Sequence, residues 1–355
     1  MKKLSLILIV ALVLSLLAGC AGTPVIYYTN CTCPVGSHNE TAEPTLPPVV
    51  GEGAVKTGLY IGTDLSGSAN AGEEAGKADF SVTVVAVNVD DAGVITACVI
   101  DSLGTSVSFD GTGAITSDPS AQILTKNELG ADYGMVAWGG AIAEWDAQAA
   151  ALANYAVGKT VEQLRSGAVN EAGYAADADL ATQATIHLGG YVDCIEQAVA
   201  NAQHLGAQAG DELRLAVMPS LGKSQSAGAE NAGLAQLDMD AVALTLRDGV
   251  ITSCYLDSLQ AKVNFDATGA ITTDLTVPVL TKNALGESYG MVAWGGAIAE
   301  WNVQAASLAA YVTGKTPAEV EGIAISEGYA AEADLATSVT IAISGYQALI
   351  LKAAK

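Results

Sequence analysis

Tyr133–Trp145 reads YGMVAWGGAIAEW, and the same letters return in the same order at Tyr289–Trp301. The displacement is 156 residues (289 − 133), and the flanking sequence repeats at nearly the same spacing. A fixed period of this kind is the sequence signature of a duplicated structural unit. Because each copy spans about 150 residues, the commonest domain size, the sequence predicts two tandem repeats at residues 54–205 and 206–355. Other matched positions are Asp101 with Asp257, Thr125 with Thr281, Gly158 with Gly314 and, after one deletion, Asp179 with Asp334.

Hydrophobic patterning within each copy predicts an α+β fold. Apolar runs at 80–89 and 94–101, and a shorter one at 105–109, indicate an antiparallel β-meander. In the second copy, Asp248-Gly249 between two apolar runs is typical of a tight hairpin turn. Helical patterns follow the strands without regular βαβ alternation, which is the α+β arrangement.

The expected helices have recognisable ends. One helix is predicted from apolar positions spaced three and four residues apart, namely Ile142, Trp145, Ala149, Leu152 and Ala156. Gly158 stands where a C-terminal helix glycine belongs. Thr160-x-x-Gln163 and Thr316-Pro317-x-Glu319 are capping boxes that begin a further short helix. Each copy is expected to close with a short strand, 184–188 in copy one, and a final helix.

The N-terminus predicts where the protein is located. Residues 1–20 read MKKLSLILIVALVLSLLAGC, which is a signal peptide ending in the lipobox Leu17-Ala18-Gly19-Cys20. Its apolar run is shorter than the ~20 residues that a spanning helix needs. We therefore expect a chain lipidated at Cys20 on the outer face of a bacterial membrane, with residues 21–53 as a proline-rich tether. The alternative is an ordinary cleaved signal with an incidental cysteine.

Charge excludes one class of partner. The formal net charge is −23, and removal of Lys2 and Lys3 with the signal makes it −25 (13 − 38). A surface this acidic repels phosphate backbones, so no nucleic-acid partner is expected.

Cysteine and histidine usage indicates neither metal binding nor hydrolytic catalysis. Cys98, Cys254 and Cys194 lie in predicted strands and a helix, where a lone cysteine is usually a small buried hydrophobe. Cys31 and Cys33 in the tether have only His38 nearby, so we expect no metal ion there, and their role stays open. No G-x-S-x-G or H-E-x-x-H motif is present, and we expect no catalytic residues.

A short polar segment occurs in both copies: Asp179-Leu-Ala-Thr182-Gln-Ala-Thr185 and Asp334-Leu-Ala-Thr337-Ser-Val-Thr340. It resembles the flavinylation motif D-x-x-[S/T]-G-A-[S/T] of FMN-binding domains. Those domains occur in the C subunit of sodium-pumping quinone reductase, the G subunit of a related electron-transport complex, and Firmicute surface lipoproteins. The resemblance implies FMN as cofactor, with Thr185 and Thr340 as phosphoester attachment residues. It also implies Asp179 and Asp334 as the acidic motif positions, and Thr182 and Thr337 as intermediate hydroxyls.

The segment departs from that motif at its glycine, which is Gln183 in copy one and Ser338 in copy two. Where glycine supplies a positive φ or a close approach, a side chain costs on the order of 1 kcal/mol. The departure opposes covalent attachment. The alternative is that each threonine faces water on a half-buried strand, because apolar residues alternate with it.

Two tryptophans of each copy have different expected roles. Trp145 lies on the apolar helix face, so we expect it in the core. Trp138 and its counterpart Trp294 precede Gly-Gly, which leaves the ring face open for an isoalloxazine or a sugar. Two functions therefore fit the sequence. One is a lipid-anchored flavin-based electron carrier with a membrane redox partner; the other is a non-enzymatic surface binding or adhesion lipoprotein that has lost flavin.

Overall fold

The computed structural model describes residues 53–355, which belong to one compact unit. The predicted signal peptide, Cys20 and nearly all of the tether lie outside the described residues. No helix among the described residues is long and apolar enough to cross a membrane.

Two three-stranded antiparallel sheets form the centre of the molecule, and the α+β class is confirmed. Residues 54–205, the first half, contribute the sheet β1-β2-β3, and residues 206–355, the second half, contribute β4-β5-β6. The strands are β1 (Lys56–Asp64), β2 (Gly76–Val89), β3 (Ile95–Phe109), β4 (Glu212–Ser220), β5 (Gly233–Arg247) and β6 (Val250–Phe265). A small hairpin of β7 (Ile325–Ser326) and β8 (Tyr329–Ala330) lies in the second half.

Two strand predictions were wrong, and two strands of the three-stranded sheets were not predicted. The runs 94–101 and 105–109 form one continuous strand, β3, because Gly104 pairs in register with Ser81 and makes no turn. Strands β1 and β4 were not predicted; in β1, Gly58 and Gly62 flank an apolar run of only three residues. The expected strand at 184–188 is irregular chain. The two-residue hairpin turn at Asp248-Gly249 was correct, with φ of 51° and 77°.

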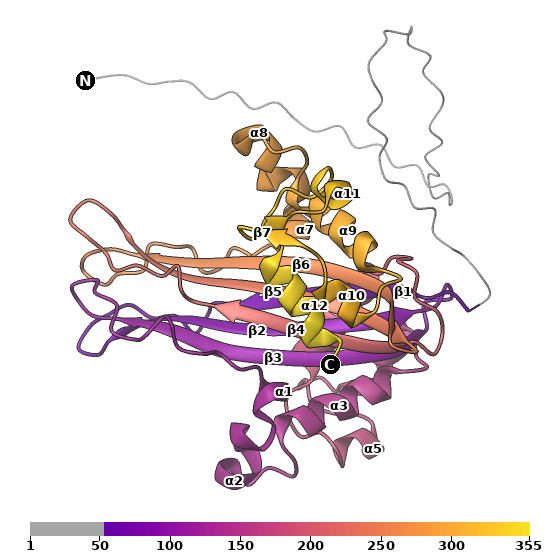
Figure 1. The fold of residues 1–355 in the computed structure, drawn as a ribbon. Coiled ribbons are helices and arrows are strands. Elements are labelled where there is room, and N and C mark those ends of the chain that lie inside the picture. The colour runs from indigo at the N-terminus through magenta and orange to yellow at the C-terminus, as the bar shows by residue number, and fades with distance from the viewer. Residues whose placement is uncertain (1–52) are drawn as a thin grey trace, which may run out of the picture. The chain divides into compact units, whose positions relative to one another are not determined.

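The two sheets pack face to face around one shared core (Figure 1). Alternate residues of each strand, such as Phe80, Val82 and Val84 on β2, point into this layer and are buried. At one end of the layer, the rings of Phe109 and Phe265 stack with centroids 4.0 Å apart and planes 3° from parallel. Because each half supplies only one side of this core, neither half buries its inner sheet face alone.

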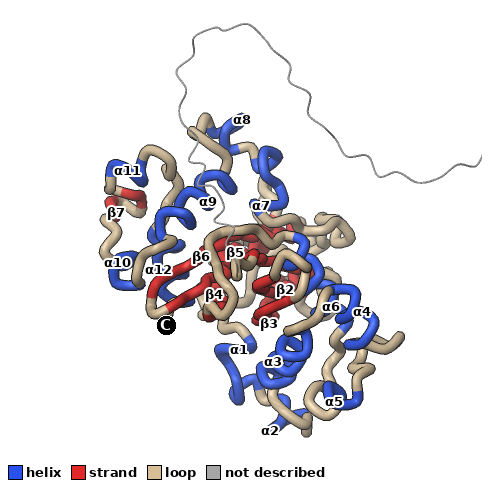
Figure 2. The backbone as a smooth tube through the Cα atoms, turned by 90° about the vertical axis from the view of Figure 1, so that its right-hand side faces the viewer, coloured by secondary structure: helices blue, strands red, loops and turns tan. Residues whose placement is uncertain are grey.

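Helices cover the outer face of each sheet, so the unit has four layers (Figure 2). In the first half α3 packs on β3 and α6 packs on β1 and β2; in the second half α9 packs on β6 and α12 on β4 and β5. The first-half helices are α1 (Lys126–Leu129), η1 (Gly130–Tyr133), α2 (Met135–Gly139), α3 (Trp145–Ala156), α4 (Val161–Ala168), α5 (Ala178–Ala181) and α6 (Gly189–Ala200). The second-half helices are α7 (Lys282–Leu285), η2 (Gly286–Tyr289), α8 (Met291–Gly295), α9 (Trp301–Val312), α10 (Pro317–Glu321), α11 (Ala333–Ala336) and α12 (Ser344–Ala353).

Backbone hydrogen bonds between the halves are reciprocal. Ala71 donates its N–H to Gly269 at 2.8 Å, and Ala227 donates to Gly113 at 2.8 Å. Both pairs are related by the displacement of 156 (227 − 71 and 269 − 113). Such exchange of identical contacts is the arrangement of a twofold interface.

The predicted helix ends were correct. Both capping boxes are formed, with Pro317 in the first turn of its helix, and Gly158 follows the end of α3 with φ of 83°. The helix predicted from Ile142 begins three residues later, at Trp145, and Ile142 lies on the preceding exposed segment.

Candidate functional site

Two exposed indole rings are the most unusual surface feature of the described chain. Trp138 on α2 is 88% exposed and Trp294 on α8 is 89% exposed. We call residues 134–143 the Trp138 loop and residues 290–299 the Trp294 loop; both read GMVAWGGAIA. In Figures 1 and 2, α2 and α8 lie at opposite ends of the unit. Valine and isoleucine side chains in the loops are exposed as well, namely Val136, Ile142, Val292 and Ile298.

A glutamate at the end of each loop holds the beginning of that loop. Glu144 accepts hydrogen bonds from the backbone N–H groups of Met135 and Val136 at 2.8 and 3.1 Å. Glu300 accepts the equivalent bonds at 2.8 and 3.0 Å. These N–H groups begin α2 and α8 and lack helical partners, so a carboxylate there satisfies them and stabilises the helix end.

Glycines fix the course of the Trp138 loop. Gly134 and Gly140 have φ of 80° and 62°, which a side chain rarely adopts. A Cβ on Gly134 would lie 2.1 Å from Cδ1 of Trp138, so the indole rests against bare backbone. Gly290 stands in the same relation to Trp294 at 2.2 Å. Each indole is therefore exposed, and its Cδ1–Nε1 edge lies against the backbone of this glycine.

The residue that follows each glutamate anchors the loop in the core. Trp145 is 2% exposed, as predicted, and its indole N–H donates to the hydroxyl of Tyr191 at 3.1 Å. The Lys126 ammonium lies 4.9 Å from the Trp145 ring centroid and 5.1 Å from that of Tyr133, within cation–π range. Lys282 makes the same pair of contacts with Trp301 and Tyr289.

A buried glutamine joins the loop to the motif threonine. Gln148 is fully buried, and its side-chain N–H donates to the carbonyl of Ala143, the last residue of the Trp138 loop, at 2.8 Å. Its amide oxygen accepts from the Thr185 N–H at 2.8 Å, the Thr185 hydroxyl at 3.3 Å and the Ile186 N–H at 3.2 Å. Gln304 and Thr340 repeat the arrangement. Thr185 and Thr340 therefore help to hold the segment that supports each loop.

The residues around these threonines do not fit a flavin phosphate. The Thr182 hydroxyl donates to the backbone carbonyl of Asp179 at 2.7 Å, and Thr337 does the same with Asp334 at 2.8 Å. The hydroxyls of Thr182 and Thr337 therefore make hydrogen bonds within their own turn, while those of Thr185 and Thr340 bond to Gln148 and Gln304. Residues 170–190 contain no lysine or arginine, and the acidic Asp177 and Asp179 adjoin the motif, so a phosphate there would meet like charge.

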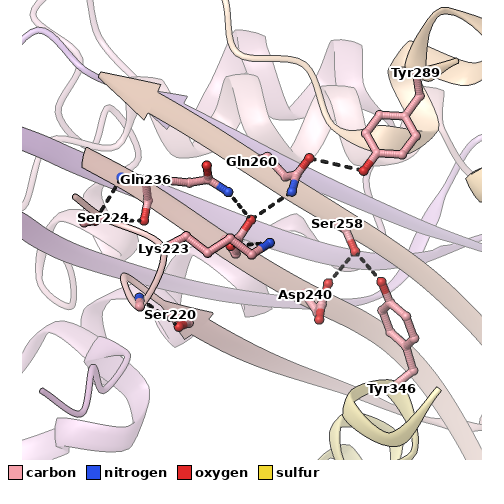
Figure 3. A network of polar contacts seen from close by, with 11 residues as sticks. Ser220, Lys223, Ser224, Gln236, Asp240, Ser258, Gln260, Tyr289 and Tyr346 are labelled. Atoms are coloured by element: carbon pink, nitrogen blue, oxygen red, sulfur yellow. Dashed lines mark hydrogen bonds and ion pairs between the residues drawn. The ribbon is translucent and has the colours of Figure 1, made fainter. Parts of the chain in front are cut away.

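The second sheet carries a polar network that the first sheet lacks (Figure 3). Asp238 accepts from Gln236 at 2.7 Å and Gln260 at 3.0 Å, and pairs with Lys223 at 3.0 Å. The matching pair in the first sheet is Ser81 with Gly104. Burial opposes ionisation of Asp238, but these three partners outweigh it and lower its pKa.

The same network continues toward α12. Asp240 accepts a hydrogen bond from Ser258, whose hydroxyl lies 3.2 Å from that of Tyr346. Burial raises the pKa of Asp240. Because Ser258 is buried and bonds to both Asp240 and Tyr346, the network joins β5, β6 and α12.

A buried aspartate tethers the first helix of each half to the sheet. Asp257 accepts from the N–H groups of Ser258 and Asn283 at 2.8 and 3.1 Å, and Asp101 accepts equivalent bonds. Burial raises the pKa of Asp257 to about 6, and that of Asp101 in the same direction. The side chains of Asn127 and Asn283 also donate to the carbonyls of Ile100 and Leu256 at 2.9 and 2.8 Å, which gives the recurrent asparagine a structural role.

Other chemistry-bearing groups are dispersed. The described residues contain no group of three or more metal-ligating side chains. One cavity of about 470 Å³ adjoins Asp91, which is paired with Lys56 and His204 at 3.0 Å each. Another of about 170 Å³ is lined in part by Cys98. Neither cavity is lined by the motif threonines. Cys254 is buried as expected, whereas Cys98 and Cys194 are half-buried.

Comparison with known proteins gives no relative: no family model, no curated protein and no solved structure matches the chain. The site has therefore to be interpreted from its own geometry. Sequence reasoning selected Trp138 and Trp294 but missed Glu144 and Gln148, although the letter-for-letter recurrence of E-W-x-x-Q marked both positions.

Proposed function

We propose that this chain is a non-enzymatic surface binding protein that makes its contacts through the Trp138 and Trp294 loops. Its two halves act as tandem repeats, each a β-meander packed with helices, and each presents one loop. The lipid at Cys20 that the sequence predicts would hold the protein on the outer face of the membrane. The proposal depends on one observation: two indole rings in identical loops are about nine-tenths exposed.

Such exposure is unfavourable in water and needs a reason. Apolar area left in contact with water forgoes about 25 cal/mol per Å², and exposed apolar groups of this size usually mark an interaction site. The support from Glu144 and Gln148 fixes the backbone of each loop, which reduces the conformational entropy lost on binding. Two copies of one loop give each molecule two contact points, one at each end of the unit.

Retention on cell envelopes tests the proposal. The mature chain carrying Cys20→Ser, which removes the lipid, is compared with Trp138→Ala, Trp294→Ala and the double variant. We expect each single variant to lose part of the retention and the double variant to lose nearly all of it. Tyr174→Ala and Tyr329→Ala remove half-exposed aromatic rings outside the loops and should bind like the parent. Unchanged retention of a folded double variant would refute the proposal.

A further inference from the structure

We infer that the Trp138 and Trp294 loops are membrane contacts, which insert their apolar side chains into the interface of a lipid bilayer whose headgroups carry no net charge. This inference rests on the proposed function and names its partner. Four features of the loops carry it, and they concern side-chain chemistry, backbone hydrogen bonding, charge and placement.

The loop side chains suit an apolar environment and little else. Within GMVAWGGAIA the indole N–H is the only hydrogen-bonding side-chain group, and no residue is charged. Saccharides require polar side chains for orientation, and protein interfaces normally carry a polar rim and about one hydrogen bond per 100–200 Å². A bilayer interface requires neither, and tryptophan is the residue most typical of that depth because its ring is apolar and its N–H is polar.

Several backbone N–H groups of the loop already have partners within the protein. The N–H groups of Met135 and Val136 bind Glu144, and that of Trp138 binds Gly134 at 2.9 Å. Those of Gly140 and Ala141 bind the carbonyls of Val136 and Met135 at 3.2 and 3.1 Å. A backbone group that enters lipid without a partner is costly, so the internal pairing of these N–H groups lowers the cost of inserting the loop.

Charge determines the kind of bilayer. The chain carries a net charge of −23, and acidic residues adjoin the loops: Asp132 and Asp146 in the first half, Glu287 in the second. Anionic headgroups would be repelled, whereas zwitterionic ones would not. The position of Asp146 is Asn302 in the second half, so the Trp294 loop meets less repulsion and should bind more strongly. The same net charge opposes association of a second copy.

Each loop should bind a bilayer weakly, and the positions of the two loops decide how many bilayers one molecule can contact. One loop buries three apolar side chains, which gives reversible binding, comparable at best with the ~10⁴ M⁻¹ of a single acyl chain. Since the loops lie at opposite ends of the unit (Figures 1 and 2), one molecule cannot lay both on one flat bilayer. It can instead join two bilayers, or add a second contact to a lipid anchor.

Vesicles of phosphatidylcholine test the inference directly. The chain has four tryptophans, two buried and two exposed, so the buried pair acts as an internal reference for fluorescence. With the Cys20→Ser chain, we expect a blue shift on vesicle addition and quenching by lipids brominated in the acyl chain. The double variant Trp138→Ala, Trp294→Ala should have a partition coefficient between water and vesicles that is about tenfold or more lower than that of the parent. Of the single variants, Trp294→Ala should lower this coefficient more than Trp138→Ala.

Two further measurements, of vesicle clustering and of the effect of an anionic lipid, distinguish a bilayer from other partners. Vesicle clustering, followed by turbidity, should require both rings, and replacing a third of the lipid with phosphatidylglycerol should weaken binding at low salt. No shift with phosphatidylcholine vesicles, together with ring-dependent retention on envelopes, would overturn this inference and leave the proposed function, with a protein partner in its place. Ring-dependent self-association in sedimentation velocity would also overturn it, in favour of a second copy. Loss of ring dependence in both assays would refute the proposed function itself.

Discussion

The carboxylate of Glu144 accepts a hydrogen bond from the backbone N–H of Met135 at 2.8 Å, nine residues earlier in the chain. The distance is the same between Glu300 and Met291. This contact closes each tryptophan loop at its base with a charged group. It explains why a glutamate recurs beside the buried tryptophan, at a position where nothing in the hydrophobic pattern requires one.

Replacing Glu144 with glutamine should loosen the Trp138 loop without removing any of its apolar side chains. The amide accepts with one oxygen instead of two and carries no charge, and a hydrogen bond to a charged group contributes about 1.5–3 kcal/mol. We expect faster amide hydrogen exchange at 135–141 and weaker envelope retention. Asp146→Asn is the matched control for hydrogen exchange, because this neighbouring acid accepts only from Ala147 at the start of α3. Its retention should not fall, since the change removes a negative charge beside the loop. Equal exchange in both variants would contradict the role of Glu144.

Gly134→Ala should displace the indole of Trp138 while keeping it in the sequence. The new Cβ would lie 2.1 Å from Cδ1 of that ring, and φ at this position is 80°. We expect lower binding, a changed near-ultraviolet circular dichroism signal, and a stability loss on the order of 1–2 kcal/mol. Gly139→Ala adds the same methyl group to the same helix, where nothing lies within 4 Å, and should leave binding unchanged. If both variants bind like the parent, orientation of the ring is unimportant.

The sequence correctly predicted helix ends and a tight turn, which are features that a few adjacent residues determine. Capping boxes, the Asp248-Gly249 hairpin and the glycine after α3 all appeared where expected, because each depends on a few adjacent residues. The joining of 94–101 and 105–109 into one strand could not be predicted, since Gly104 is compatible with either a turn or a strand. The stacking of two sheets on one core depends on contacts between residues over a hundred positions apart.

The candidate site was predicted in part. Exposure of Trp138 and burial of Trp145 followed from their places relative to glycines and to the helix period. The role of Thr185 did not follow, because its hydrogen bond to Gln148 spans 37 residues and leaves no periodic trace. Likeness to a short motif indicated a cofactor at a position where the fold uses the hydroxyl for support.

Phe109 and Phe265 should be coupled in stability. They occupy equivalent places in the two halves and stack across the shared core. Each change to alanine should cost about 3–5 kcal/mol through lost burial and the cavity left behind. In a double-mutant cycle with leucine substitutions, we expect a coupling of about 0.5–1.5 kcal/mol, typical of an aromatic pair. Strict additivity in urea unfolding would show that the stacked geometry contributes nothing of its own.

Covalent flavin should be absent from the chain even when a flavin transferase is co-expressed. The motif hydroxyls are bound to Gln148 and Gln304, and acidic neighbours oppose a phosphate. A denaturing gel viewed under blue light should show no fluorescent band. Thr185→Val should instead lower stability by about 0.5–1.5 kcal/mol, since it removes one hydrogen bond of a buried amide. A fluorescent band that disappears in the Thr185→Ala, Thr340→Ala chain would restore the electron-carrier function.

Asp257 should make the protein less stable as pH rises through the weakly acidic range. Burial raises the pKa of this carboxyl to about 6 in the folded chain, against 3.8 for the free group. The folded state therefore binds the proton more tightly than the unfolded state, and the stability this provides below pH 4 is lost as pH rises to about 6. Asp257→Asn keeps an acceptor for Ser258 and Asn283 but does not titrate. In urea unfolding, the stability of the parent relative to this variant should fall by about 2 kcal/mol between pH 4 and pH 7.

Asp266→Asn is the control, and the pH dependence of its parent-minus-variant stability should have the opposite sign. Hydrogen bonds from Thr268 and Ala270 lower the pKa of that exposed carboxyl. The stability that Asp266 contributes is therefore lost as pH falls. A parent-minus-variant difference for Asp257 that is flat with pH would show that burial does not raise the pKa of this carboxyl.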